Sequence, residues 1–492
     1  MPAFSLEPAQ VAWCAELRSL AADRLRPLAE KGEPGRVNRP LLADLGRLGL
    51  LERLFTSGAL DLCLMRESLA YACTEAETAL ALQGLGAHPV HAHGTPAQRA
   101  RWLPAVADGS AVAAFALSEP GAGSDAAALA LRAEPEGDGP PEARARPAST
   151  VGAPAPATGH GGAPAPATAH GAPAPAASPP GAPAPAASAH QGGAAREPAP
   201  RAGDLDTPRP GKPRSPHAGA RQPAGPGVPP APAAPPAPAP GGPLTARPDG
   251  PRRWRLTGGK SWISNAPEAD VYTVFARTTP GAGARGVTAF LVPADRPGLT
   301  GGALEMLSPH PIGTLDFDGV PVTEDDVLGE VDRGFRVAMG TLNLFRPSVG
   351  AFAVGMAQAA LDATVAHTAH RDAFGGTLSD LQAVAHQVAE MALRTEAARL
   401  MVHAAASAYD SGAPDVPRRS AMAKLLATET AQYVVDAAVQ LHGARALCRG
   451  HLLEHLYREV RAPRIYEGAS EVQRAIIAKE LYAQQQSTGE AP

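Results

Sequence analysis

Residues 135–251 separate two parts of this 492-residue chain that have a very different composition. The segment contains no Phe, Trp, Tyr, Ile or Met, holds 32 of the 53 prolines, and repeats the hexamer GAPAPA from residues 152, 162, 171 and 181. A segment without large apolar side chains cannot bury enough surface to offset the entropy lost on ordering. It therefore predicts a disordered, partly polyproline-II insertion, either a passive loop or a docking and tethering arm.

The rest of the chain is long and apolar enough for two or three domains with their own cores, since 44% of all residues are hydrophobic. A net charge of −4 is too mild to indicate nucleic-acid binding. Cys14, Cys63, Cys73 and Cys448 form no CxxC pair and no metal-ligand spacing. We therefore expect buried thiols, no metal site and a reducing compartment.

The N-terminal residues lack the basic region and apolar core of a signal peptide, and they carry acidic residues that a transit peptide avoids. We find no run of about 18 apolar residues that would cross a membrane. These features predict a cytoplasmic protein that is not embedded in a membrane.

Hydrophobic periodicity changes twice along the chain. Apolar residues recur at helical spacing near both ends, and short β-branched runs with turn residues fill the middle. The pattern predicts an α+β multidomain protein. Its parts are an N-terminal helical domain (1–110), a central β-barrel-like or sandwich domain (111–327) that contains the insertion, a C-terminal four-helix bundle (328–485), and a tail (486–492).

Two local signals give sharper predictions. Thr95, Pro96 and Gln98 have the spacing of a helix start, with a reciprocal cap between Thr95 and Gln98 and proline at the first helical position. Residues 281–286, GAGARG, match the G-x-G-x-x-G pattern of dinucleotide-binding loops. That pattern requires a following helix, whereas VTAFLVP is β-branched, so we predict a hairpin turn instead.

The stretch RIYEGASEVQR, residues 464–474, places Glu467 before a glycine and ahead of a helix-like run. Taken alone, a Glu-Gly pair before a helix is usually a solvated turn. The alternative is that Glu467 is a catalytic base, and the segments elsewhere in the chain decide between the two readings.

Those segments resemble the acyl-CoA dehydrogenase family of flavoproteins in order and approximate spacing. The matching pieces are FALSEPGAGSD, LTGGKSWISNAPEADVYTVFART, RGVTAFLVP, the run from Leu342 to Arg346, HRDAFG, DLQAVAHQVAEM, VQLHGA and IYEGASEVQR. The insertion falls where the family has a tight β-hairpin turn, a place that tolerates long insertions because closure entropy grows only logarithmically with length.

The resemblance implies FAD-dependent α,β-dehydrogenation of an acyl-CoA thioester to the trans-2-enoyl thioester. Glu467 matches the base that removes the α proton while a hydride passes to flavin N5. Its backbone N–H matches a donor to the thioester carbonyl. The residues that match flavin-binding positions are Phe115, Leu117, Ser118, Ser124, Trp262 and Ser264.

By the same resemblance, a neighbouring subunit completes the FAD site through Arg371, Phe374, Gln440 and Gly443, which implies a homo-oligomer, a dimer or a tetramer. Positions matching substrate contacts are Ser124, Asn343, Arg346 and Tyr466. The implied partners are an acyl-CoA, or an acyl carrier protein thioester, and an electron-transfer flavoprotein as the electron acceptor.

Two alternatives stay open at this point. The first keeps the fold but lets O2 reach the flavin, as in an acyl-CoA oxidase or a flavin monooxygenase-like relative. The second is a non-catalytic binding protein that uses the Pro-rich insertion as its interaction arm. The sequence does not reveal the acyl chain.

Overall fold

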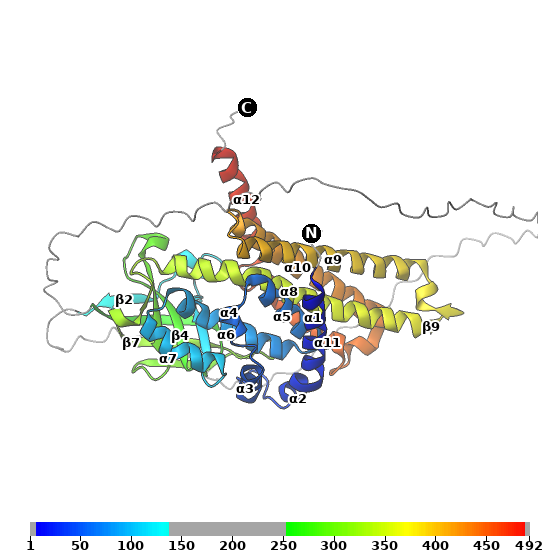
Figure 1. The fold of residues 1–492 in the computed structure, drawn as a ribbon, viewed down its shortest axis with the longest axis horizontal. Helices are drawn as coiled ribbons and strands as arrows, with labels where there is room; N and C mark the ends of the chain where they lie inside the picture. Colours follow the sequence, from blue (N-terminus) through cyan, green and yellow to red (C-terminus); the bar gives the residue numbers. More distant parts are fainter. Residues whose placement is uncertain (1–5, 137–251, 488–492) are drawn as a thin grey trace, which may run out of the picture. The chain divides into compact units, whose positions relative to one another are not determined.

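The computed structural model describes residues 6–136 and 252–487, and Figure 1 shows their arrangement. The predicted disorder of the insertion lies outside these residues from position 137 onward. Pro135 and Glu136, which the sequence placed in the insertion, belong to ordered structure: Pro135 ends a strand, and the Glu136 amide donates to the Arg253 carbonyl at 3.0 Å.

The N-terminal region is helical, as predicted. Its helices are α1 (Pro8–Leu20), α2 (Arg26–Ala29), α3 (Arg39–Arg47), α4 (Arg53–Thr56), α5 (Ala59–Ala72), α6 (Thr74–His93) and α7 (Pro96–Ala107), with one π-helical turn (Ala21–Leu25) joining α1 to α2. The predicted reciprocal cap at the start of α7 is confirmed, because the Gln98 amide donates to the Thr95 hydroxyl and the Thr95 amide to the Gln98 side chain.

The central region is one hydrogen-bonded sheet of eight strands among the described residues. The strands are β1 (Ala113–Ala116), β2 (Arg132–Pro135), β3 (Arg253–Ser264), β4 (Val271–Arg277), β5 (Val287–Pro293), β6 (Leu299–Ala303), β7 (Ile312–Thr323) and β8 (Val327–Leu328). They pair in the order β6-β7-β3-β2-β4-β5-β8, and β1 pairs parallel with β4. The pairing gives a single mixed sheet, and the predicted barrel-like or sandwich form stays a prediction.

The predicted hairpin at residues 281–286 is confirmed. A short 3-10 turn, Gly283–Gly286, joins β4 to β5, and these strands pair antiparallel from Val271–Pro293 to Arg277–Val287. No helix follows the glycines, so the backbone geometry of a dinucleotide-binding loop is missing there.

The C-terminal region contains α8 (Gly334–His370), α9 (Gln382–Asp410), α10 (Val416–His442), α11 (Leu452–Glu459) and α12 (Ser470–Ser487), with a small hairpin of β9 (Asp372–Ala373) and β10 (Gly376–Thr377) after α8. α8 begins beside the sheet, runs between α5, α9 and α10, and ends at this hairpin (Figure 1). Three long helices therefore form the centre of the region, and α5 from the N-terminal region packs with them.

The helix α8 is long and apolar enough to cross a membrane, with a mean hydropathy of 1.4 over its most apolar window. However, 72% of that window is buried inside the protein. Alanines and glycines on α8 allow its neighbours to approach closely: a Cβ on Gly355 would lie 2.3 Å from the Glu67 carbonyl oxygen of α5. The apolar surface of α8 is thus used in the core.

Candidate active site

A cavity of about 530 Å³ lies where the helical regions meet the sheet. Its wall is built by α5, α6, the segment after β1, the end of β3, α8 and the connection from α11 to α12. The structure brings together there these residues predicted from the sequence: Phe115, Leu117, Ser118, Ser124, Trp262, Ser264, Arg346, Tyr466 and Glu467. They come from four regions of the chain that are far apart in sequence.

Glu467 has a left-handed backbone conformation, with φ of 52°, and Gly468 follows with φ of 96°. Non-glycine residues rarely adopt this conformation, and it persists only where the surroundings enforce it. A Cβ on Gly468 would lie 2.6 Å from the Gln473 Nε2 atom. The Glu-Gly pair thus turns the chain sharply and brings the Glu467 side chain to the cavity.

Three buried polar side chains hold this turn through its backbone oxygens. Arg346 donates from Nε to the Glu467 carbonyl at 3.2 Å, and Lys424 donates from Nζ to the Gly468 carbonyl at 2.8 Å. Gln473 donates from Nε2 to both carbonyls, at 3.2 and 2.8 Å. All three donors contact the main chain, so the Glu467 carboxylate is not used to fix the turn.

The Glu467 carboxylate has a free acceptor in a buried site, because its Oε2 atom is shielded from solvent and has no hydrogen-bond partner among the described residues. Burial raises the pKa of Glu467, and the nearby charges of Arg66, Lys424 and Arg346 oppose that rise. Burial also lowers the pKa of Lys424 to about 8. A carboxylate with a raised pKa and a free oxygen has the properties of a general base.

Arg66 on α5 brings a further positive charge to the cavity wall. Its guanidinium forms an ion pair with the fully buried Glu77 of α6 and donates from Nη1 to the Ser348 hydroxyl at 2.7 Å. The Arg66–Glu77 pair is therefore close to neutral as a unit. The positive charge of Arg66 still acts on Glu467 and helps to keep the Glu467 carboxylate ionisable in a buried position.

Trp262 also lines the cavity, and it lies where the β3–β7 register shifts between Lys260 and Ile263. Its φ of 58° is left-handed, and half of its side chain is exposed. A strand bulge redirects side chains in this way. The bulge places the indole at the cavity instead of in the core, where an ordinary strand tryptophan would pack.

A buried ion pair connects β3 to the segment that follows β1. Lys260 donates from Nζ to Glu119 Oε1 at 2.7 Å and to the Leu117 carbonyl at 2.9 Å. The Glu119 carboxylate also accepts from the amides of Ala130 and Leu131. Burial lowers the pKa of Lys260 to about 8. The Ser261 amide also donates to the Ser118 carbonyl at 3.1 Å, so Leu117 and Ser118 are held beside β3 and the two segments line the cavity together.

Ser118, Ser124 and Ser264 also line the cavity. None of their hydroxyl groups forms a hydrogen bond with a described residue. Unpaired hydroxyls beside a half-exposed indole suit a flat aromatic ring with polar edges. The residues present therefore fit an isoalloxazine ring, with the partnerless Glu467 oxygen in the same cavity.

The remaining predicted residues lie elsewhere. Arg371 and Phe374 are exposed at the β9–β10 hairpin, and Phe374 is 91% exposed with φ of 54°. Gln440 and Gly443 are exposed at the C-terminal end of α10. Asn343 is half-buried on α8 outside the lining, where its Oδ1 atom lies 3.5 Å from Arg346 Nη1. Their predicted roles toward FAD and CoA stay predictions.

The sequence reading missed the buried polar residues that position the predicted ones, namely Arg66, Glu77, Glu119, Lys260, His310, Lys424, Glu459 and Gln473. A single charged residue inside an apolar helix run, such as Lys424 in SAMAKLLATETA, was the available signal. That signal is weak, because an exposed helix face gives the same pattern.

Three domain models of one family match the chain in order. They are the acyl-CoA dehydrogenase N-terminal domain (residues 7–110), middle domain (240–320) and C-terminal domain (332–482). Together they span more than half of the chain. The chain belongs to the acyl-CoA dehydrogenase family, whose members are oxidoreductases that use FAD.

Sequence comparison finds curated relatives that are also acyl-CoA dehydrogenases. The probable acyl-CoA dehydrogenase FadE25 of Mycobacterium tuberculosis is 40% identical over 231 residues, 46% of this chain and 59% of that protein. The human short-chain specific acyl-CoA dehydrogenase, a mitochondrial protein, is also 40% identical over 231 residues, 46% of this chain and 56% of its own length. The matched stretch thus spans less than two thirds of each relative.

The fold is shared with butyryl-CoA dehydrogenase from Megasphaera elsdenii. The two structures superpose with a TM-score of 0.70 at 24% identity, over 97% of this chain and 99% of that one. At this identity the likeness concerns the fold alone.

Proposed function

We propose that this protein is an FAD-dependent acyl-CoA dehydrogenase that oxidises the Cα–Cβ bond of an acyl thioester to a trans-2-enoyl thioester. The observation that carries the proposal is the Glu467 carboxylate, which is buried, has a free oxygen and a raised pKa, and shares one cavity with Trp262 and Ser118. FAD, when bound, supplies the two-electron acceptor for the β hydride.

The chain's own residues then have separate tasks. Glu467 removes the α proton through its free carboxylate oxygen, and the Glu467 backbone N–H is a candidate donor to the thioester carbonyl, where negative charge develops. Arg346, Lys424 and Gln473 keep the turn in its strained conformation, so that the base needs little reorganisation when substrate binds.

In this proposal, the part of the cavity wall that contains Trp262 holds and orients the flavin ring. Trp262 supplies an aromatic face, and the hydroxyls of Ser118 and Ser264 are available to the polar edge of the ring. Phe115 packs against Phe275 with ring centroids 4.9 Å apart, which stabilises the apolar side. The shielding of the Glu467 Oε2 atom limits the access of water to the carboxylate.

The exposed residues around the β9–β10 hairpin support assembly of this protein into a homo-oligomer. A phenylalanine that is 91% exposed in a left-handed conformation, Phe374, is costly in water unless another surface covers it. With Arg371, Gln440 and Gly443 exposed near the same end, the proposal includes a dimer or tetramer in which these residues contact FAD of a neighbouring subunit. An electron-transfer flavoprotein is the proposed electron acceptor.

The four cysteines, all within the described residues, are free. Cys63 and Cys73 are buried and Cys14 is half-buried, whereas Cys448 is exposed, so the predicted burial is wrong for Cys448. Free thiols agree with a reducing compartment, and the cytoplasm is the location we propose.

The proposed reaction is tested by loading the purified protein with FAD and adding acyl-CoAs of different length and branching without oxygen. We expect bleaching of the flavin absorbance and formation of the 2-enoyl-CoA. A protein that cannot be loaded with FAD would contradict the proposal. Rapid reoxidation in air with stoichiometric peroxide would instead identify an oxidase.

A further inference from the structure

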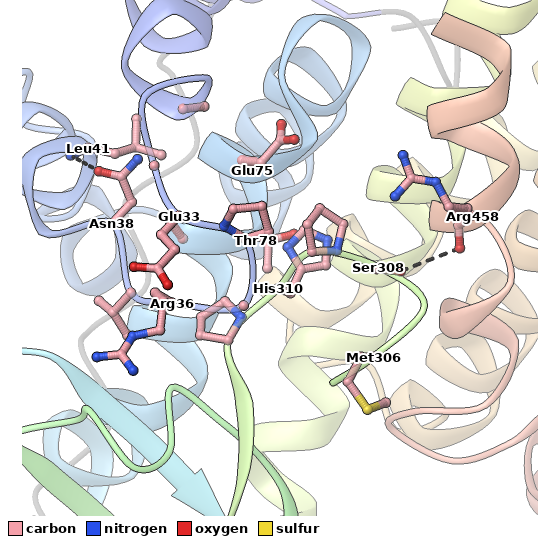
Figure 2. Close-up of a pocket in the computed structure, with 18 of the residues that line it drawn as sticks. Glu33, Arg36, Asn38, Leu41, Glu75, Thr78, Met306, Ser308, His310 and Arg458 are labelled. Carbon is pink, nitrogen blue, oxygen red and sulfur yellow. Dashed lines mark hydrogen bonds between the residues drawn. The ribbon is translucent and has the colours of Figure 1, made fainter. Parts of the chain in front are cut away.

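A second cavity, of about 990 Å³, shares lining residues with the one that contains Glu467, and Figure 2 shows side chains that line it. It lies between the α2–α3 connection, the start of α6, the β6–β7 connection and α11. The residues that line both cavities, and therefore form the wall between them, are Thr78, Leu82, Met306, Leu307, Ser308 and His310. An acyl chain that extends past these residues leaves one cavity and enters the other.

The second cavity is rich in charged side chains. Five carboxylates and three guanidinium groups line it: Glu30, Glu33, Glu75, Glu305 and Glu454, and Arg36, Arg449 and Arg458. The chamber suits a chain that carries polar groups.

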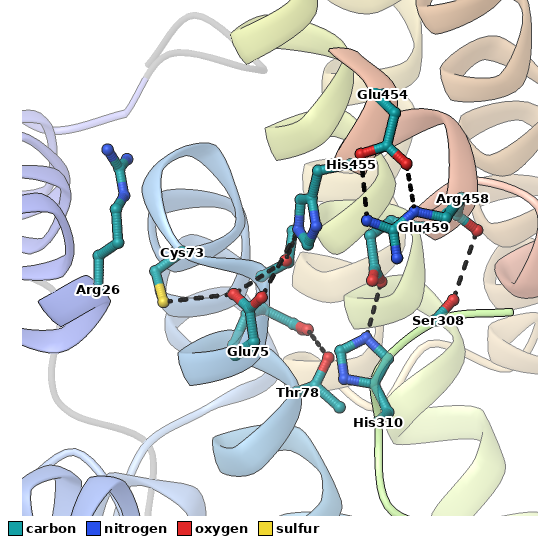
Figure 3. A network of polar contacts seen from close by, with 12 residues as sticks. Arg26, Cys73, Glu75, Thr78, Ser308, His310, Glu454, His455, Arg458 and Glu459 are labelled. Carbon is teal, nitrogen blue, oxygen red and sulfur yellow. Dashed lines mark hydrogen bonds and ion pairs between the residues drawn. The ribbon is translucent and has the colours of Figure 1, made fainter. Parts of the chain in front are cut away.

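The wall itself contains a buried ion pair (Figure 3). The His310 Nε2 atom lies 2.7 Å from Glu459 Oε2, and the Glu459 side chain is 1% exposed. Glu459 also lines the Glu467 cavity, and its second oxygen, Oε1, is buried without a hydrogen-bond partner in the described structure. A buried carboxylate oxygen of this kind is normally paired, so the site is built to receive a donor.

Polar groups near Glu459 do not supply that donor: Tyr466, which lines the same cavity, forms no hydrogen bond with Glu459, and other groups have partners of their own (Figure 3). Arg458 donates from Nε to Glu454 at 2.8 Å, and the Thr78 hydroxyl donates to Glu77 at 3.2 Å. The charge of Glu459 is already opposed by His310. The missing partner is therefore a neutral donor, such as a hydroxyl, instead of a second cation.

We infer that the substrates of this protein are acyl thioesters whose chain carries a hydroxyl group remote from the thioester, and that Glu459 Oε1 accepts its hydrogen bond at the wall between the two cavities. The inference rests on the proposed dehydrogenase function and specifies its substrate class. In a substrate whose chain continues beyond the hydroxyl, that further part enters the second cavity. A plain alkyl chain leaves the Glu459 oxygen buried and unpaired, which weakens binding roughly 10- to 100-fold.

The test measures binding apart from turnover. The FAD-loaded Glu467→Gln variant is titrated calorimetrically with straight-chain acyl-CoAs from hexanoyl to hexadecanoyl, and with the counterpart of each that carries a terminal hydroxyl. We expect the hydroxylated member of at least one pair to bind roughly 10- to 100-fold more tightly. Equal or weaker binding of the hydroxylated member at every length would overturn the inference, and this comparison needs no change at Glu459.

A second comparison tests whether the preference for hydroxylated acyl-CoAs depends on the His310–Glu459 pair between the two cavities. In the same background, the double change His310→Leu with Glu459→Leu replaces the buried pair by apolar side chains and should abolish the hydroxyl preference. The matched control, Glu390→Leu with Arg394→Leu, removes an exposed ion pair on α9 and should keep it. A preference that survives the first double change would place the recognition elsewhere and overturn the inference.

Turnover by the unchanged protein distinguishes a failure of the substrate inference from a failure of the proposed function. If it oxidises acyl-CoAs but hydroxylation brings no gain in binding, only the substrate inference fails. If it oxidises none of the panel, the proposed function fails and the inference fails with it.

Discussion

The Arg346 guanidinium donates from Nε to the main-chain oxygen of Glu467 at 3.2 Å and forms no ion pair with the Glu467 carboxylate. An ion pair would hold the carboxylate in its charged form and weaken it as a base. The observed contact instead fixes the backbone of the strained turn and leaves the carboxylate oxygen free. In the proposed reaction, Arg346 is thus a positioning residue for Glu467.

The raised pKa of Glu467 has a consequence for stability. Because the folded state disfavours the ionised carboxylate, Glu467 costs folding free energy above its raised pKa and nothing below its unfolded pKa, near 4. Glu467→Gln should therefore raise the free energy of unfolding at neutral pH, by about 1.4 kcal/mol for each tenfold rise in proton affinity. The gain should vanish as the pH falls toward 4. Denaturant unfolding across this range measures it, and a variant that is less stable at neutral pH would contradict the assignment.

Lys424 should control the acid limb of the pH–rate profile. Its ammonium lowers the pKa of Glu467, and with its own pKa near 8 it is charged throughout that limb. Lys424→Gln removes the charge, so the pKa of Glu467 should rise and the fall in kcat/KM should begin at higher pH. Lys479→Met, on an exposed position of α12, is the control and should leave the limb in place. A limb that moves to lower pH, or stays, would show that Lys424 does not act on the base.

The buried Lys260–Glu119 pair should matter far more than an exposed pair nearby. Lys260→Met leaves Glu119 buried and uncompensated, which we expect to cost roughly 3–5 kcal/mol of unfolding free energy and to weaken FAD binding. Arg132→Met breaks an exposed pair with Glu134 and should cost less than about 1 kcal/mol. Chemical denaturation and FAD titration give both quantities. Equal effects of the two changes would mean that the pair does not organise the cavity.

The insertion should be dispensable for folding. β2 pairs with β3 up to Pro135–Trp254, so the chain leaves and re-enters the sheet at adjacent positions. Replacing residues 137–251 by a short turn should preserve the sheet. Each doubling of a flexible loop costs about 0.6 kcal/mol, so the shortened chain should gain up to roughly 3 kcal/mol in unfolding free energy. Loss of folding or of assembly would assign the insertion a structural role.

The sequence was most informative where the signal is local. The cap at Thr95 and the turn at residues 281–286 depend on neighbouring residues, and both predictions are confirmed. The grouping of Glu467 with Trp262 in one cavity came from the family resemblance, since no local pattern links residues that are so far apart.

The buried charges were not predictable in the same way. Lys260, Lys424 and Glu459 look like ordinary surface residues in their sequence context, and only the packing of distant elements removes them from water. The strained conformation of Glu467 is equally hidden, because it depends on donors from α8, α10 and α12. These residues set the chemistry of the site, and three-dimensional contacts are required to find them.

The most direct test of the central claim is the rate of flavin reduction by an acyl-CoA substrate, measured by stopped flow without oxygen in the unchanged protein, in Glu467→Gln, and in the control Glu480→Gln on α12. If Glu467 is the base, its replacement should lower this rate roughly 10²- to 10⁴-fold while the variant stays yellow and still binds acyl-CoA, and the control should react normally. Flavin reduction by Glu467→Gln at the unchanged rate would contradict the account.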